Sequence, residues 1–207
     1  MNEKNIPAIV ISRLPKYLIT LEKLHNQEIE KTSSNELGAL LDITPAQIRK
    51  DLSFFGGFGK KGSGYSIPNL IHVIRDILNL DIVWDVAIVG AGKIGQGLAL
   101  YEGFLNRGFS IKVLFDNDPN KIGQRVGVHQ IYDIRNLQVI IQDLNIKVAL
   151  VAVPQAHAQK VADQLVQAGI KAILNYTPVY LTSPNSDVVI LQIDPILQLQ
   201  NMTYYLK

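Results

Sequence analysis

The chain contains no cysteine, and its apolar segments are short. Without cysteine it can form no disulfide, no thiolate metal site and no thiol-based redox sensor. The longest uninterrupted apolar stretch, Val148–Pro154, is far too short to cross a bilayer. The opening residues show no small-residue cleavage pattern, so no secretory signal is predicted. We therefore expect a cytoplasmic protein without a membrane partner, in which a bound cofactor must carry any response to redox state.

The charge of the chain is nearly balanced, with 20 Lys and Arg against 18 Asp and Glu and a formal net charge of +2. So small an excess is by itself no argument for a nucleic-acid partner. Residues 43–65 are different, because four cations there face a single anion, Asp51. This segment is locally basic, and its meaning depends on the structure that it forms.

The apolar pattern changes along the chain. Up to about residue 80 the spacing is helical, and from residue 86 onward short apolar runs alternate with helical stretches. Continuous apolar runs such as VALVAV are typical of a parallel sheet that is covered on both faces. The final stretch, PILQLQNMTYYLK, is helical and apolar over most of its circumference, so it needs covering on more than one side. We predict an α/β protein with domains over 1–80 and 85–193 and a C-terminal helix over 194–207.

The first domain is predicted to contain a helix-turn-helix. Ser33 and Glu36 have the spacing of a capping box, and Thr44 and Gln47 repeat it after a short turn, around Pro45. Two helices joined by so tight a turn form a helix-turn-helix. The predicted helices of this domain run over 12–27, 33–41, 45–55 and 68–80.

Polar side chains on the second of these two helices, and in the run GGFGKKGSGYSI after it, are candidates for DNA contacts. Arg and Gln can make bidentate contacts with base edges, whereas Lys suits phosphate or guanine. The glycine-rich run predicts a two-stranded wing with two lysines at its tip, within reach of a minor groove or its phosphates. A solvated helix face followed by a loop stays open as the alternative. The candidate DNA-binding residues are Gln47, Arg49, Lys50, Lys60, Lys61 and Tyr65.

The sharpest motif is VAIVGAGKIGQG, a buried strand that runs directly into Gly-x-Gly-x-x-Gly at the start of a helix. Gly90 permits a tight turn, Gly92 lets the backbone approach a pyrophosphate, and Gly95 lets helix and strand pack closely. Asp116 ends the next strand, where a carboxylate accepts hydrogen bonds from a ribose diol and repels a 2′-phosphate. The motif therefore predicts a Rossmann-like domain that binds NAD(H). The predicted site includes the residues between the glycines, namely Ala91, Lys93 and Ile94.

An enzyme would need chemistry beyond cofactor binding. Hydride transfer to a carbonyl requires a proton donor and a substrate pocket, usually on a further domain. Of the four histidines only His157, just beyond Pro154 at a strand end, is placed to approach a nicotinamide, and an incidental role is commoner. No catalytic residue and no metal site is predicted. An NAD(H)- or CoA-binding enzyme with an accessory helical domain stays open, although it does not explain residues 1–84.

The chain resembles the Rex family of redox-sensing transcriptional repressors over essentially its whole length. The matching stretches are ISRLPKYL, QIRKDLSFFGGFGKKGSGY, VGAGKIGQGLA, FDNDPNKIG, VPQAHAQ and GIKAILNYTPVYL, of which the second is highly specific. The resemblance implies a homodimer of subunits that each join a winged-helix domain to a Rossmann domain. It implies that the C-terminal helix, here from about Pro195, is exchanged to pack between the partner's domains. Such a protein represses genes when NAD⁺ dominates and leaves its operator DNA when NADH binds.

The resemblance also assigns roles to residues. It implies that the three motif glycines hold the pyrophosphate, that the acid after the second strand holds the adenosine ribose, and that Tyr101 and the Pro154 loop lie nearer the nicotinamide. Two positions depart from the family's pattern. Ile19 stands where the family usually has an arginine that resembles a switch partner for a C-terminal aspartate, here Asp194. Pro195 stands where the family usually has Leu or Phe beside the nicotinamide. A DNA-binding paralogue with a weakened NADH response is therefore a second hypothesis.

Overall fold

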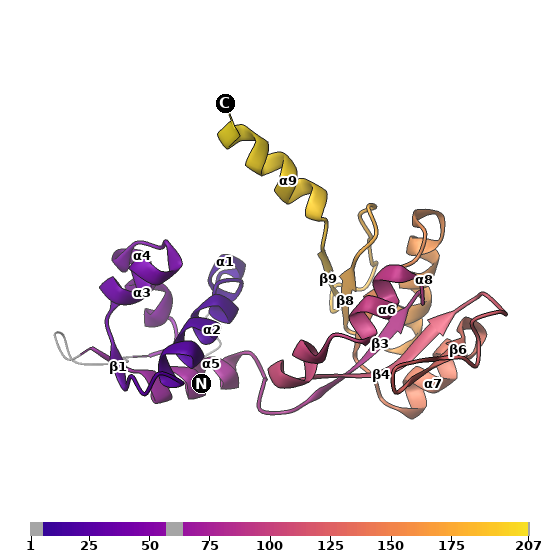
Figure 1. The fold of residues 1–207 in the computed structure, drawn as a ribbon, viewed down its shortest axis with the longest axis horizontal. Coiled ribbons are helices and arrows are strands. Elements are labelled where there is room, and N and C mark those ends of the chain that lie inside the picture. The colour runs from indigo at the N-terminus through magenta and orange to yellow at the C-terminus, as the bar shows by residue number, and fades with distance from the viewer. Residues whose placement is uncertain (1–5, 57–63, 207) are drawn as a thin grey trace. The chain divides into compact units, whose positions relative to one another are not determined.

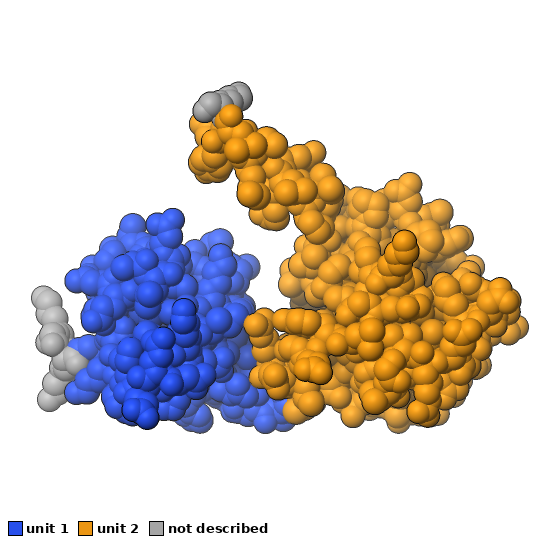
Figure 2. Space-filling model, in the orientation of Figure 1, with its two compact units in different colours: residues 1–82 blue, residues 83–207 orange. Residues whose placement is uncertain are grey.

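The computed structural model describes residues 6–56 and 64–206 of the chain. It forms two compact units, residues 1–82 and residues 83–207 (Figure 1, Figure 2). Their boundary falls between residues 80 and 85, where the apolar pattern changes from helical spacing to alternating strands and helices. Within the described residues, no helix has the length and apolar character needed to span a membrane.

The described residues of the first unit are helical apart from one small sheet (Figure 1). Its helices are α1 (Ala8–Ile11), α2 (Leu14–His25), α3 (Ser34–Leu41), α4 (Pro45–Ser53) and α5 (Ile67–Ile77), and its strands are β1 (Lys31–Thr32) and β2 (Tyr65–Ser66). Helices α2 to α5 each turn an apolar face to one shared core, as their sequence spacing predicts. The buried apolar side chains of this core are Leu14, Tyr17, Leu18, Leu21, Leu37, Ile48, Leu52, Ile67, Leu70 and Ile74.

Helices α3 and α4 form the predicted helix-turn-helix. The Ser33 Oγ accepts from the N–H of Glu36 at 3.2 Å, and the Glu36 carboxylate accepts from the N–H of Ser33 at 2.8 Å, so the first capping box is complete. Thr44 caps α4, because its Oγ1 accepts from the N–H of Gln47 at 3.2 Å. The second predicted capping box is only half formed. The Gln47 side chain turns the other way and donates to Asp51.

Strand β2 lies where the second strand of the predicted wing was expected. It pairs antiparallel with β1, from the segment between α2 and α3, so that Tyr65 lies opposite Thr32. Residues 57–63, most of the glycine-rich run, lie outside the described residues, so the wing itself stays a prediction. Two residues are too few to show the alternating pattern of a strand, which is why β1 is absent from the prediction. Lys60 and Lys61 lie outside the described residues.

The second unit is built on a seven-stranded sheet with the strand order β5-β6-β4-β3-β7-β8-β9 (Figure 1). Its neighbouring strands pair in parallel, apart from the antiparallel pair β5–β6. The order from β6 to β9 is that of a Rossmann fold, in which the strand order reverses between β3 and β7. The strands are β3 (Trp84–Val89), β4 (Phe109–Asp116), β5 (Arg125–Val126), β6 (His129–Asp133), β7 (Val148–Val151), β8 (Ala172–Asn175) and β9 (Val189–Gln192).

Helices cover both faces of this sheet. They are α6 (Lys93–Ala99), α7 (Leu137–Asp143) and α8 (Gln155–Ala168), with the 3-10 helices η1 (Glu102–Arg107) and η2 (Ile134–Asn136). Ala87 and Val89 of β3 pack with α7 and α8, whereas Val86 and Ile88 pack with α6 and η1. Because both faces are buried, β3 reads as a continuous apolar run, which confirms the predicted α/β fold with a parallel sheet.

Two parts of this unit differ from expectation. The sequence pattern predicts one helix over 92–108 after the glycine turn, but the helix ends at Ala99 and the 3-10 helix η1 follows. Gly97 and Gly103 both lie in this stretch, and each costs about 1 kcal/mol of helix stability relative to alanine. The Tyr101 ring also lies where a Cβ on Gly103 would be, so the broken geometry depends on that glycine. The elements β5, β6 and α7 are short and were not individually predicted.

The chain ends in α9 (Pro195–Thr203) and η3 (Tyr204–Leu206), which project from the body of this unit (yellow in Figure 1). Asp194 caps α9, because its Oδ1 accepts from the N–H of Ile196 at 2.9 Å, and Pro195 occupies the first turn. None of the side chains described in α9 and η3 is buried. The predicted apolar helix is therefore present and uncovered within one chain.

Candidate cofactor and DNA-binding sites

Two glycines of the motif are required by the fold itself. Gly90 directly follows β3 and has a φ of +101°, a conformation that residues with side chains rarely adopt. A Cβ on Gly90 would also clash with the carbonyl oxygen of Ala152, at the end of β7. Gly95 lies in α6, where a Cβ would overlap the carbonyl oxygen of Gly90. Because Gly90 and Gly95 have no Cβ, the turn can pack closely between β3, β7 and α6.

The packing and backbone conformation of this unit do not require glycine at position 92. Its φ of −81° and ψ of −170° suit any residue, and a Cβ there would meet no atom within 4 Å. The missing side chain leaves open space in front of the turn, at the edge of the sheet where the strand order reverses. A dinucleotide pyrophosphate needs this kind of close approach to the backbone. The residues of the turn therefore fit a dinucleotide.

Asp116 is 7% exposed at the end of β4, and its carboxylate is already engaged. Its Oδ2 accepts from the N–H of Ala91 at 2.8 Å and from the Lys121 Nζ at 3.1 Å, and its Oδ1 accepts from the N–H of Asp118 at 2.9 Å. Burial alone would raise the pKa of Asp116, but these hydrogen bonds hold it below its usual value. A carboxylate has roughly four acceptor positions. Asp116 thus anchors the turn to β4 and has little capacity left for a ribose diol.

The Pro154 loop lies beside the glycine turn. The N–H of Ala152 donates to the carbonyl of Val89 at 2.9 Å, and the Val153 side chain contacts the position that a Cβ on Gly90 would take. Pro154 follows, exposed at the start of α8. The two loops therefore lie side by side at the ends of β3 and β7, where the strand order reverses and such sheets usually bind their ligands.

The loop after β8, at the same edge of the sheet, has a buried polar network that was not predicted. The Asn175 Nδ2 donates to the carbonyl of Val179 at 2.7 Å and to the Gln192 Oε1 at 2.6 Å. Gln192 in turn donates to the carbonyl of Thr177, whose own buried hydroxyl has no hydrogen-bond partner among the described residues. The network ties the end of β8 to β9, the strand that leads into α9. It joins residues up to 17 apart, so no local pattern signals it.

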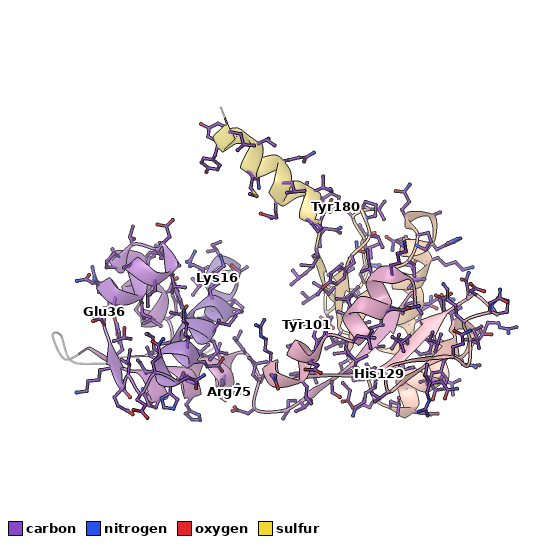
Figure 3. All side chains as sticks on the ribbon, viewed as in Figure 1. Lys16, Glu36, Arg75, Tyr101, His129 and Tyr180 are labelled. Atoms are coloured by element: carbon purple, nitrogen blue, oxygen red, sulfur yellow. The ribbon has the colours of Figure 1, made fainter. Side chains whose placement is uncertain are left out.

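Tyr101, which the resemblance places toward the nicotinamide, is 55% exposed. It lines a groove of about 790 Å³ between η1, the first half of β4 and the turn before β6. Tyr101 and His129, two of the lining residues, are labelled in Figure 3. The ring of Tyr101 meets that of Phe104 edge to face, with 5.6 Å between their centroids. The lining includes neither the glycine turn nor Pro154, so the role of Tyr101 beside the nicotinamide stays a prediction. The apolar lining residues include Leu100, Phe104, Leu105, Phe109, Ile111 and Val128.

Helix α4 carries three of the candidate DNA-binding side chains. Arg49 and Lys50 are exposed, and Gln47 is partly exposed. The Arg49 Nη1 donates to the Ser34 Oγ at 2.9 Å, which steadies the guanidinium beside the start of α3. Tyr65, the fourth described candidate, lies in β2 and packs partly against the core of the first unit.

A buried carboxylate, Asp51, holds α4 against α2. The Nε and Nη2 of Arg13 donate to its two oxygens at 2.6 and 2.7 Å. The Tyr17 hydroxyl donates at 2.6 Å and the Gln47 Nε2 at 2.7 Å. Burial alone would raise the pKa of Asp51, but these hydrogen bonds outweigh burial and hold its pKa below the usual value. Burial also raises the pKa of Tyr17, so its hydroxyl stays a donor.

The sequence contains a signal that the Asp51 side chain is buried, beyond its charge. With Ile48 and Leu52 it has i, i+3, i+4 spacing, which places a carboxylate on the apolar face of α4. A buried carboxylate requires partners. The sequence cannot name them, because Arg13 is 38 residues away.

Asp51→Ala is expected to lower the free energy of unfolding of the first unit by about 3–5 kcal/mol, because it strands the Arg13 guanidinium, whose side chain is only 19% exposed. The folded pKa of Asp51 lies below its unfolded value. The contribution of Asp51 to the free energy of unfolding is therefore fully present above roughly pH 4. It is lost as the pH falls through the folded pKa. Urea unfolding, monitored by hydrogen exchange of α2 and α4 between pH 7 and pH 3, measures the loss of stability and its dependence on pH. The exposed Asp76→Ala of α5 is the control, and equal stability of the two variants would contradict the prediction.

Comparison with known proteins agrees with this architecture. Residues 5–53 match a family model described as "Putative DNA-binding protein N-terminus", and residues 81–179 match one described as "CoA binding domain". The redox-sensing transcriptional repressor Rex of Chloroflexus aggregans is 50% identical over 200 residues, which cover 97% of this chain and 94% of that protein.

Solved structures agree over the same length. The structure of RSP, a Rex-family repressor, in complex with beta-NAD⁺ and operator DNA has a TM-score of 0.92 at 36% identity and covers 97% of this chain and 92% of that one. RSP in complex with beta-NADH has a TM-score of 0.89 at 34% identity and covers 99% and 95%. The chain therefore belongs to the Rex family of redox-sensing transcriptional repressors.

Proposed function

We propose that this chain is a homodimeric repressor that binds operator DNA through its first unit and senses NADH against NAD⁺ through its second. The observation that carries the proposal is the full-length similarity to RSP, whose structures contain beta-NAD⁺ with operator DNA and beta-NADH. The relatives are named repressors, so we infer that the crevice senses the cofactor without catalysing a reaction. Such a repressor acts where its DNA is, in the cytoplasm.

For DNA, the proposal assigns base contacts to α4. Arg49 has a free side of its guanidinium for the two acceptors of guanine, and Lys50 suits phosphate or guanine. Lys60 and Lys61 are assigned to phosphates or an adjacent minor groove, and Tyr65 to the base of the wing. We therefore assign the sequence-reading contacts to α4 and the sequence-independent ones to Lys60 and Lys61.

For the cofactor, the proposal assigns the pyrophosphate to the turn from Gly90 to Gly95, with Ala91, Lys93 and Ile94 completing its backbone. Asp116 holds this turn and offers at most one further acceptor to the adenosine ribose, and the Pro154 loop lies toward the nicotinamide. NAD(H) supplies the redox signal, since its nicotinamide ring is cationic when oxidised and neutral when reduced. The protein's part is to favour one arrangement of its two subunits with each form.

The dimer is inferred from α9 and the groove beside Tyr101. The apolar side chains of α9 and η3 are 40–81% exposed, and a monomer rarely leaves so large an apolar surface uncovered. The groove on the same unit, of about 790 Å³, is lined mainly by apolar residues of η1 and β4. We infer that each subunit's α9 covers the groove of its partner, as an exchanged helix.

The test is operator affinity at saturating NADH and at saturating NAD⁺. We expect NADH to weaken binding by roughly 5–150-fold, which corresponds to the usual ~1–3 kcal/mol of coupling between two sites. The probe is a duplex that the protein itself selects from a random-sequence pool, and fluorescence anisotropy measures its binding. Failure to enrich any sequence would favour the enzyme hypothesis. A specific complex that ignores NADH would identify a paralogue with altered sensing.

Substitution of Ile19 tests whether an ion pair with Asp194 sets the size of the NADH effect. It is 49% exposed on α2, and it cannot form an ion pair with Asp194 as an arginine would. We expect Ile19→Arg to increase the NADH effect and the added Asp194→Asn to remove the gain. Asparagine caps a helix as well as aspartate does, so α9 keeps its start and only the ion pair is lost. Pro195 remains unchanged in all variants, and an NADH effect unaltered by Ile19→Arg would show that the switch uses other residues.

A further inference from the structure

We propose that Gln47 reads an adenine in the major groove and that Asp51 is the positioning residue that orients its amide. The inference rests on the proposed DNA-binding function, and it concerns which base this helix recognises.

The orientation of the Gln47 amide is determined by its neighbours. A glutamine amide on a free surface can rotate by 180°, which exchanges its oxygen and its NH₂ group. Here the Nε2 lies 2.7 Å from the Oδ1 of Asp51. An ionised carboxylate can only accept hydrogen bonds, so the NH₂ group must face it and the Oε1 must face away.

The carboxylate itself has no freedom to turn. Asp51 is fully buried, and the two nitrogens of Arg13 each hold one of its oxygens at 2.6 and 2.7 Å. The Tyr17 hydroxyl holds the Oδ2 again at 2.6 Å. Because α4 is also capped by Thr44 through the backbone N–H of Gln47, both ends of the Gln47 residue are anchored. The amide is thus oriented before DNA arrives, which lowers the entropy cost of a contact.

The atoms that remain free on the amide are one acceptor and one donor, the Oε1 and the second N–H hydrogen. In the major groove adenine presents a donor at N6 and an acceptor at N7, side by side. Guanine presents two acceptors, cytosine a single donor, and thymine an acceptor beside a methyl group. Adenine is the base that can use both free atoms of Gln47. Arg49 presents only donors and matches guanine, so the two side chains read different bases.

The test measures base preference and not affinity alone. The wild-type protein selects a duplex from a random-sequence pool, and every single base-pair substitution of that duplex is then bound to wild type and variants. We expect wild type to prefer adenine at one position by about tenfold or more, and Gln47→Ala to lose this preference while the other positions keep theirs. Gln27→Ala, the same change at an exposed glutamine after α2, should leave the whole profile unchanged.

Asp51→Asn tests the positioning role. An asparagine offers both a donor and an acceptor, so it no longer dictates which way the Gln47 amide faces. We expect the adenine preference to fall while the guanine preference that depends on Arg49 persists. If this variant does not fold, the side-chain amide hydrogens of Gln47 in the wild type answer the same question by NMR. One of them should exchange more slowly than those of Gln27.

The outcomes separate the two proposals. A pool that enriches no sequence overturns the DNA-binding function itself. An enriched duplex whose base preferences are all retained by Gln47→Ala overturns the reading of adenine alone. Retained adenine preference in folded Asp51→Asn, or equal exchange for Gln47 and Gln27, overturns the positioning role of Asp51.

Discussion

Replacing Gly92 by valine is expected to abolish binding of both NAD⁺ and NADH while the protein stays folded. The backbone of Gly92 suits any residue, and a Cβ there would meet no protein atom within 4 Å. The loss of glycine at the helix start costs about 1 kcal/mol of stability at most. The new side chain fills the space through which a pyrophosphate approaches the turn, so affinity should fall by about 100-fold or more, equivalent to ~3 kcal/mol. Calorimetry with each cofactor measures the loss, and thermal unfolding measures the stability.

Gly95→Ala is the matched control for this experiment. It adds one methyl group within the same motif, but that group would overlap the carbonyl oxygen of Gly90. We expect this variant to lose stability and cofactor binding together. Gly92→Val should therefore separate binding from folding, and Gly95→Ala should not. Full NADH affinity in Gly92→Val would remove the glycine turn from consideration as the cofactor site.

A chain that stops after Asp194 is expected to be monomeric at low micromolar concentration. The truncation removes apolar side chains such as Ile196, Leu199 and Met202, which are 55–61% exposed in a single chain and need a partner to cover them. A monomer meets only one half-site, so operator affinity should fall by roughly 10²–10⁴-fold, the usual gain from linking two binding modules. Analytical ultracentrifugation and anisotropy measure the two losses.

Point variants distinguish a lost interface from a damaged chain end. Leu199→Glu keeps α9 but places a charge on its apolar surface, and we expect it to weaken the dimer as the truncation does. Asn201→Ala changes a polar residue of the same helix and should leave the dimer intact. An intact dimer in the truncated chain would contradict the exchange of α9.

The features that could be predicted from sequence are those with local causes. The glycine turn, the Ser33 capping box, and the strands β3 and β4 follow from spacing, turn chemistry and continuous apolar runs. What was missed depends on residues far apart in the chain. Strand β1 exists only because β2 lies beside it, and Asp51 is paired only because α2 carries Arg13.

The candidate sites also combine features that local sequence predicts with contacts that only the fold creates. Spacing placed Asp116 at the end of the right strand, but not the Lys121 ammonium and the two backbone donors that occupy its carboxylate. Spacing also gave no sign of the groove that Tyr101 lines, because its walls come from η1, β4 and the turn before β6. The sequence pattern therefore located the glycine turn and α4. Contacts in the folded chain determine which of their atoms remain free to bind a ligand.

The hydrogen bonds at Asp51 also make a mechanical connection. Arg13 precedes α2 and Tyr17 lies in it, and both donate hydrogen bonds to the Asp51 carboxylate of α4. Ile19, on the same helix, is 49% exposed. We infer that a displacement of α2 by a contact at Ile19 would be transmitted to α4 through these hydrogen bonds, without unfolding of either helix.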